Sequence, residues 1–100
     1  MTVVIGANGL ALVTVACAQA NTVNGFASFM SFELSGANTL AASDSNSVYF
    51  VHPTGNQAKR ASATVLLKGL AAGSTTFTAK YRGNGNTASF DNRHIAVIPL

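Results

Sequence analysis

The fold of this chain is decided by the stretch GLAAGSTTFTAKYRGNGNTASFDNRHIAVIPL, residues 69–100. Polar and apolar residues alternate along three of its segments, and turn residues separate these segments. Alternation with a period of two places successive side chains on opposite faces of a strand. The stretch therefore predicts three antiparallel strands, over 74–82, 87–90 and 93–99. The aromatic residues Phe77, Tyr81 and Phe90, together with Ala79, are predicted to face inward.

The rest of the chain repeats this pattern. Five further strands are predicted at Thr2–Ile5, Leu10–Gln19, Phe26–Ser35, Val48–His52 and Ala61–Lys68. Asn8-Gly9 and Gly83–Asn86 are predicted hairpin turns, and Gly69–Gly73 is a predicted corner between sheets with Leu70 buried. No segment has a sustained helical period. The sequence predicts an all-β fold: one domain, residues 1–100, built as an antiparallel two-sheet β-sandwich, jelly-roll-like, of about eight strands.

Charge is scarce along the chain. Charged residues make up 9% of the composition, against about 25% in an average globular protein. Such a surface of neutral polar groups is typical of extracellular and virion β-proteins. The net charge of +3 is spread over the second half without a basic tract. On a strand, Lys80 and Arg82 share one face while Tyr81 points to the other, so we predict no nucleic-acid binding.

The single cysteine, Cys17, excludes a disulfide within the chain and is predicted to be buried. Residues 1–20 resemble an export signal only superficially, because they lack a basic start and Gly6–Gly9 interrupts the apolar run. The same interruption argues against a membrane-spanning helix. Two strands joined by a tight turn are predicted instead.

Two segments predict contacts beyond an ordinary core. Both faces of Leu10–Gln19 are largely apolar, so this strand should be covered on both sides, by the domain itself or by a neighbouring subunit. In Phe26–Ser35, Phe29 and Glu33 lie on the face expected to meet solvent. They are either a lone exposed aromatic beside a solubilising carboxylate or part of a subunit contact. The long connection Gly36–Ser47, with a brief bridge expected at 39–41, is typical of a functional or interface loop.

No reactive set of residues emerges from the sequence. The only carboxylates are Glu33, Asp44 and Asp91, which lie on a strand face and in two turns. His52 and His94 lack the spacing of metal ligands and are predicted to be surface or interface residues. A serine triad has no nucleophile elbow to hold it. We therefore predict no enzymatic activity, no metal and no cofactor.

Surface recognition remains as the expected role. Exposed hydroxyl, amide and aromatic side chains on strand faces suit either homotypic packing or stacking against carbohydrate. The residues predicted to form such an interface are Phe29, Glu33, Tyr49, Lys59, Arg60, Arg93 and His94.

One pattern in the second half resembles a known family. It consists of ASAT at 61–64, GL at 69–70, GS-x-x-FTAKYR at 73–82, a glycine turn, F-x-NR at 90–93 and the terminal IAVIPL. This pattern is similar to a small β-sandwich domain of tailed phages of actinobacteria. There it looks like the C-terminal domain of minor tail or fibre proteins, or a stand-alone virion protein. The resemblance covers about residues 30–100.

The resemblance implies a non-enzymatic structural virion protein. Such a protein would act as a capsid decoration or accessory protein, or as a tail or fibre-tip component. Its implied partners are other virion proteins and its own copies, with homotrimers common, and its implied location is the virion. The alternative is a module that binds carbohydrate or the host surface, through Tyr49 and Phe29.

Overall fold

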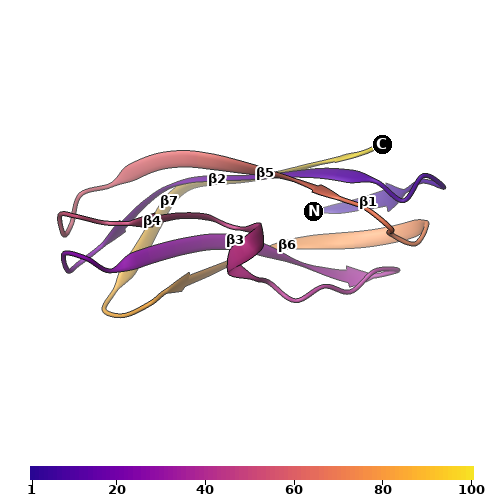
Figure 1. Ribbon diagram of the computed structural model, residues 1–100. Coiled ribbons are helices and arrows are strands. Elements are labelled where there is room, and N and C mark those ends of the chain that lie inside the picture. Colours follow the sequence, from indigo (N-terminus) through magenta and orange to yellow (C-terminus); the bar gives the residue numbers. More distant parts are fainter.

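Strands make up most of the structure, a computed structural model that describes residues Met1–Leu100. The seven strands are β1 (Thr2–Ile5), β2 (Ala11–Asn21), β3 (Ala27–Gly36), β4 (Val48–Val51), β5 (Lys59–Leu67), β6 (Gly73–Gly83) and β7 (Ala88–Pro99). A short 3-10 helix, η1 (Asp44–Asn46), precedes β4. The long strands run along the molecule, which measures 45 × 19 × 17 Å (Figure 1).

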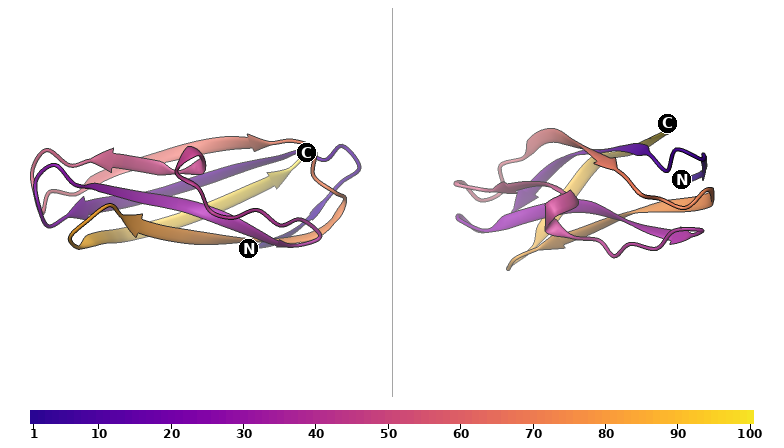
Figure 2. Two further views of the ribbon diagram at one scale, coloured as in Figure 1. Left: turned by 60° about the horizontal axis from the view of Figure 1, so that its bottom comes forward. Right: turned by 45° about the vertical axis from the view of Figure 1, so that its right-hand side comes forward.

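Two antiparallel sheets pack face to face, as Figure 2 shows from two further directions. One sheet has four strands in the order β1-β6-β3-β4, and the other has three in the order β5-β2-β7. The predicted all-β two-sheet sandwich is confirmed. The predicted bridge after β3 is also present, since Leu34 pairs with Leu40.

Only one pair of consecutive strands, β3 and β4, lies in the same sheet. The hairpins predicted at Asn8-Gly9 and Gly83–Asn86 are therefore wrong, although the chain does turn there. Gly9 donates a backbone hydrogen bond to Gly6 at 3.1 Å, yet β1 then pairs with β6 while β2 lies in the other sheet. A turn dipeptide sets the local backbone direction, whereas burial of the inner faces decides which strands pair.

A single strand, β7, replaces the two strands predicted over 87–90 and 93–99. Asn92 has the positive φ of 49° expected of a turn residue. Its strand nevertheless continues along β2, with a register shift between Ala16 and Ala18. An extra residue in the left-handed conformation is absorbed as a β-bulge, which bends the strand without ending it.

The predicted corner between the sheets is present at Gly69–Gly73, but Leu70 is half-buried rather than buried. Leu70 packs against the core, and its amide donates to the carbonyl of Gly9 at 3.1 Å. Gly9 has a φ of 65°, and a Cβ there would lie 2.6 Å from the Leu70 oxygen. This close approach requires glycine.

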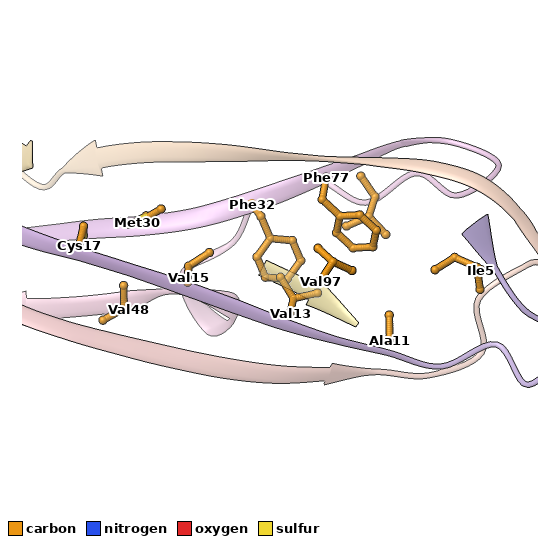
Figure 3. Close-up of a cluster of buried hydrophobic side chains, with 11 residues drawn as sticks. Ile5, Ala11, Val13, Val15, Cys17, Met30, Phe32, Val48, Phe77 and Val97 are labelled. Atoms are coloured by element: carbon orange, nitrogen blue, oxygen red, sulfur yellow. The ribbon is translucent and has the colours of Figure 1, made fainter. Parts of the chain in front are cut away.

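The core lies between the sheets (Figure 3). Its buried members are Ile5, Ala11, Val13, Val15, Cys17, Met30, Phe32, Leu34, Val48, Phe77 and Val97. The rings of Phe32 and Phe77 pack with their centroids 6.3 Å apart. Alternate residues of β2 point into this core, and those between them are half-buried on the outside. Within one chain, β2 is therefore covered on one side only.

Candidate functional site

The outer surface of the β5-β2-β7 sheet carries several exposed aliphatic side chains. Register places Leu66, Leu12 and Ile98 side by side across the three strands. The side chains of Leu66 and Ile98 are 45% and 58% exposed. The next row contains Thr64, Thr14 and Ala96, and the row after that Ser62, Ala16 and His94. We call these nine residues the apolar face.

The apolar face contains no Asp, Glu, Lys or Arg. Its one internal polar contact joins the hydroxyls of Thr14 and Thr64 at 2.9 Å. Leu100, 47% exposed, extends it at one end, where its amide donates to Leu10. Arg60 and Asp91 flank Ala18 at the other end. The face thus consists mainly of small and aliphatic side chains, with Arg60 and Asp91 at one end and Lys68, two residues beyond Leu66, at the other.

The outer surface of the other sheet is polar and carries an aromatic stack. Phe29 of β3 is registered opposite Tyr49 of β4 on one side and Arg82 of β6 on the other. The Phe29 and Tyr49 rings stack at 5.2 Å, and the Arg82 guanidinium lies 4.1 Å from the Phe29 centroid. Phe29 is therefore neither lone nor free: both its faces are occupied within the chain. The exposed ring is Tyr49, at 55%.

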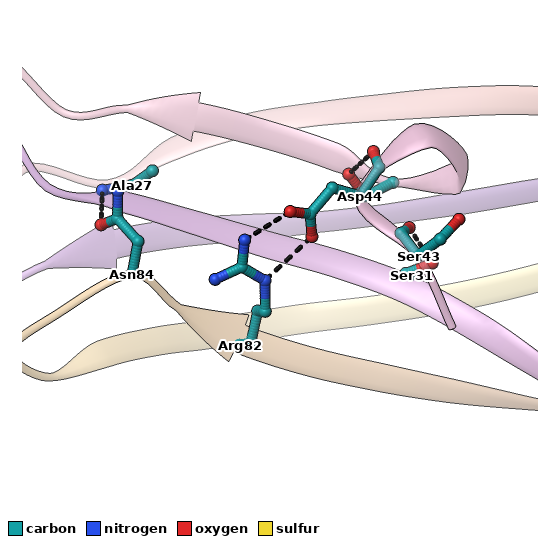
Figure 4. Close-up of polar contacts among 7 residues, drawn as sticks. Ala27, Ser31, Ser43, Asp44, Arg82 and Asn84 are labelled. Atoms are coloured by element: carbon teal, nitrogen blue, oxygen red, sulfur yellow. Dashed lines mark hydrogen bonds and ion pairs between the residues drawn. The ribbon is translucent and has the colours of Figure 1, made fainter. Parts of the chain in front are cut away.

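Side-chain hydrogen bonds and an ion pair join the loop between β3 and β4 to β3 and β6 (Figure 4). Arg82 binds Asp44 through two nitrogens, and its Nε lies 2.9 Å from Oδ1. This hydrogen-bonded pairing holds the pKa of Asp44 below its usual value. Ser31 Oγ donates to the Ser43 and Asn46 carbonyls at 2.9 Å each. A pocket of about 160 Å³ opens between this loop and β6.

The seven residues predicted as an interface fall into separate groups. Phe29, Tyr49 and Glu33 share the outer surface of the four-stranded sheet, where Glu33 pairs with Lys80 at 3.2 Å. His94 belongs to the apolar face, and Arg60 lies just beyond it, opposite Ala18 on the same side of the three-stranded sheet. Lys59 begins β5, and Arg93 lies over the Tyr81 ring at 5.5 Å. They do not form one surface.

Sequence reasoning missed the apolar face as a unit, although its residues were available. The outward residues of β2 were recognised as apolar. Their neighbours on β5 and β7 could not be identified without the strand order. Leu66 and Ile98 lie on either side of Leu12 because β2 is the central strand of the sheet.

A groove opens between β6 and β7 where the chain crosses from one sheet to the other. Phe77 is buried as predicted, whereas Tyr81 points between the sheets and remains 38% exposed. The Tyr81 and Phe90 rings meet at 4.9 Å. These two aromatic residues and Arg93 line a volume of about 480 Å³.

His52 is buried, so the prediction of a surface or interface histidine is wrong there. It is 1% exposed, and its Nε2 lies 2.6 Å from Ser28 Oγ. Ser28 in turn donates to Gln19 Oε1 at 2.7 Å. The Ser28 proton is used by Gln19, so His52 Nε2 carries the hydrogen in its own bond, and Nδ1 has no partner. Burial and the charge of Lys59 lower the pKa of His52.

This Gln19-Ser28-His52 cluster does not have the form of a catalytic site. Ser28 contacts an amide and an imidazole, and no carboxylate orients the far nitrogen of the ring. Its three members are inward-facing polar residues of β2, of β3 and of the position after β4, and they satisfy one another. His94 is exposed, as predicted.

The remaining chemistry-bearing groups are scattered. Cys17 is buried, as predicted, and burial raises the pKa of its thiol, which keeps it protonated. No three side chains of histidine, cysteine, aspartate or glutamate lie close enough together to hold a metal ion. None of the helical structure is long and apolar enough to cross a membrane.

Comparison of the chain with protein-family models, with curated proteins and with solved structures gave no match. The resemblance to a phage sandwich domain therefore stays a prediction.

Proposed function

We propose that this chain is a non-enzymatic structural protein of a tailed-phage virion, which assembles through the apolar face with its own copies and with neighbouring virion proteins. The observation that carries the proposal is the exposed row Leu66-Leu12-Ile98, which with the next two rows forms a sheet surface without Asp, Glu, Lys or Arg. A contiguous apolar surface of this kind marks a contact with another macromolecule.

The size of the apolar face sets the strength expected of the contact. The three rows, each about 6.8 Å deep along the strands, and the three strands correspond to a surface of roughly 20 × 14 Å, or about 300 Å². Two such faces packed together would bury about 600 Å², which is below the roughly 1,200 Å² of a stable specific interface. A single contact would therefore be weak, and several contacts in a symmetric particle would reinforce one another.

This strength suits a capsid decoration protein or a tail or fibre-tip component. Such proteins occupy repeated positions on a particle, and a homotrimer around a threefold axis is the arrangement that the resemblance implies. Each copy would turn its three-stranded sheet toward a neighbour. The polar surface over β6, β3 and β4 would then face outward.

Imaging of intact particles tests the placement in a virion. Antibody raised against the purified chain, carrying gold, should label capsids or tails at regular positions in electron micrographs. Antibody absorbed with the purified chain is the control. Particles that lack the chain in both their images and their protein composition would contradict the proposal.

A second function is favoured by one specific observation, the exposed ring of Tyr49. It stacks on Phe29 with one face, and the residue is 55% exposed. Arg82 and its ion pair with Asp44 lie on the other side of Phe29, so they do not border the free face of Tyr49. An exposed aromatic face suits stacking against a sugar ring. In this case the chain is a glycan-binding or host-surface-binding module.

A glycan array distinguishes the two functions. A binding module would give reproducible hits that disappear in Tyr49→Ala and weaken in Phe29→Ala, which loses the support under the tyrosine. Val51→Ala, on the same strand and also exposed, is the matched control and should keep them. An array without hits removes this second candidate.

A further inference from the structure

Strand β1 covers only the first part of the edge of β6. Its residues pair with Gly73–Thr76, and Met1 then exchanges two hydrogen bonds with Phe77, at 2.7 and 2.9 Å. Beyond Phe77, β6 continues to Gly83 with β3 on one side and no strand on the other. In Figure 2 (left) the N-terminus lies part-way along β6. The edge position in line with β1 is empty along the second half of β6.

The backbone groups at this empty position can be identified from Phe77. Its amide and carbonyl both point to the β1 side, where they bond to Met1. Because orientation repeats every second residue along a strand, Ala79 and Tyr81 point their amides and carbonyls to the same side. No backbone hydrogen bond outside the sheet ladder uses them. They form an unpaired edge of the kind that accepts an additional strand.

The groove beside this edge can hold side chains. It is the volume of about 480 Å³ between β6 and β7, and Tyr81 and Phe90 form its aromatic wall. A strand added next to Ala79 and Tyr81 would point alternate side chains into this volume. The groove therefore supplies pockets, and the β6 edge supplies main-chain hydrogen bonds. These are the two elements of β-strand addition.

The charges around the groove define the partner. Arg93, in the groove, forms no ion pair. Lys80 and Arg82 are each paired with one half-exposed carboxylate, Glu33 and Asp44 respectively, on the outer surface of the sheet. A strand that approaches this edge thus meets three cations and two carboxylates, a net charge of +1 that comes from the unpaired Arg93, and an acidic side chain opposite Arg93 would be favoured.

We propose that the β6 edge and the β6–β7 groove form an acceptor site for an extended, acidic segment of a partner protein. The segment runs antiparallel to β6, in line with β1, with apolar side chains against Tyr81 and Phe90 and a carboxylate near Arg93. A second copy of this chain fits poorly. Its Glu33, Asp44 and Asp91 are never two residues apart on one strand, and its own β6 would bring Lys80 and Arg82 against like charges.

This site is separate from the apolar face, which lies on the outer side of the other sheet. Acceptance of a strand does not depend on self-association or on a place in a virion. The binding experiment can therefore be repeated on a Leu66→Lys variant, in which the apolar face carries a charge. Peptide binding by this variant can therefore succeed or fail independently of the imaging test of the proposed function.

The test uses fluorescein-labelled peptides of about ten residues, the length of a long strand. One alternates valine with aspartate, a second replaces aspartate by lysine, and a third is the acidic peptide with alternate backbone amides methylated. Fluorescence anisotropy should show the acidic peptide binding at least about tenfold tighter than the other two. Arg93→Glu should remove this preference. Lys68→Glu makes the same charge change outside the groove and should leave the preference largely intact.

Amide hydrogen exchange locates the bound strand. With the acidic peptide present, the amides of Ala79 and Tyr81 should gain protection, and those of the free β5 edge, such as Thr64, should not. Equal binding of the three peptides overturns the proposal. The proposal is also overturned if Arg93→Glu and Lys68→Glu lose the preference for the acidic peptide to the same extent, or if amides of β5 rather than β6 gain protection. A dissociation constant for the acidic peptide above about 1 mM would overturn it as well.

Discussion

Acid should destabilise this protein through His52, and the effect can be calculated from the structure. The imidazole is 1% exposed, its Nε2 hydrogen is used by Ser28, and its Nδ1 faces no donor or acceptor. Burial lowers the pKa of His52 from its ordinary value of 6.5, so the folded protein keeps the ring neutral where the unfolded chain protonates it. Stability is therefore complete above pH 6.5 and falls as the pH drops below it.

The magnitude follows from proton linkage. While the folded state binds one proton fewer than the unfolded state, the free energy of unfolding falls by about 1.4 kcal/mol per pH unit. The fall continues until the pH reaches the lowered pKa of the folded state. Asp44 changes stability in a lower range, because its pKa lies below 3.8 in the fold and its contribution is lost only as the pH falls through that value. The interval between about pH 6.5 and 5 therefore isolates His52.

Urea unfolding at half-unit pH steps measures this slope. The chain has no tryptophan, so far-ultraviolet circular dichroism is the signal. His52→Gln keeps a donor toward Ser28 and cannot titrate, so its stability should be flat between about pH 6.5 and 5. His94→Gln removes the exposed histidine and should keep the wild-type slope. A wild-type stability that stays constant through this interval, or a slope lost in His94→Gln, would refute the reasoning.

Three further predictions concern packing. Phe32→Ala removes a fully buried ring against Phe77 and should lower the free energy of unfolding by about 3–5 kcal/mol, measured by urea unfolding; a loss below about 1 kcal/mol would contradict this core. Gly9→Ala should destabilise more than Gly69→Ala, because both have a positive φ but only the first brings a Cβ against Leu70; equal melting temperatures would disprove that contact. Cys17 should react with a thiol reagent only at the rate of unfolding, and immediate reaction in native buffer would show that it is accessible.

The strands could be predicted from the sequence because alternation survives in nearly every segment. Their pairing could not. Asn8-Gly9 predicts a turn whether the flanking strands join one sheet or two, and here they join two. Likewise, Asn92 adopts the left-handed conformation expected of a turn, yet β7 accommodates it as a bulge. Local residue preferences do not contain this long-range information.

The buried polar cluster could have been predicted from the sequence, because two polar residues occupy inward-facing positions of predicted strands. Ser28 interrupts the inward face of β3, and Gln19 continues the inward face of β2 after Cys17. Two polar residues directed into one core require a common partner, which the structure supplies in His52. The Phe29 stack had no such signal, since its neighbours Tyr49 and Arg82 are set by the strand order alone.

Sedimentation equilibrium tests the central claim, assembly through the apolar face, most directly. Wild-type protein should associate reversibly as its concentration rises, and Leu66→Lys, which places a charge in the aliphatic row of the face, should remain monomeric. Thr78→Lys adds the same charge to the outer surface of the other sheet, where Thr78 is exposed, and should associate like the wild type. A wild-type chain that stays monomeric at millimolar concentration, or association that survives Leu66→Lys, would contradict the account.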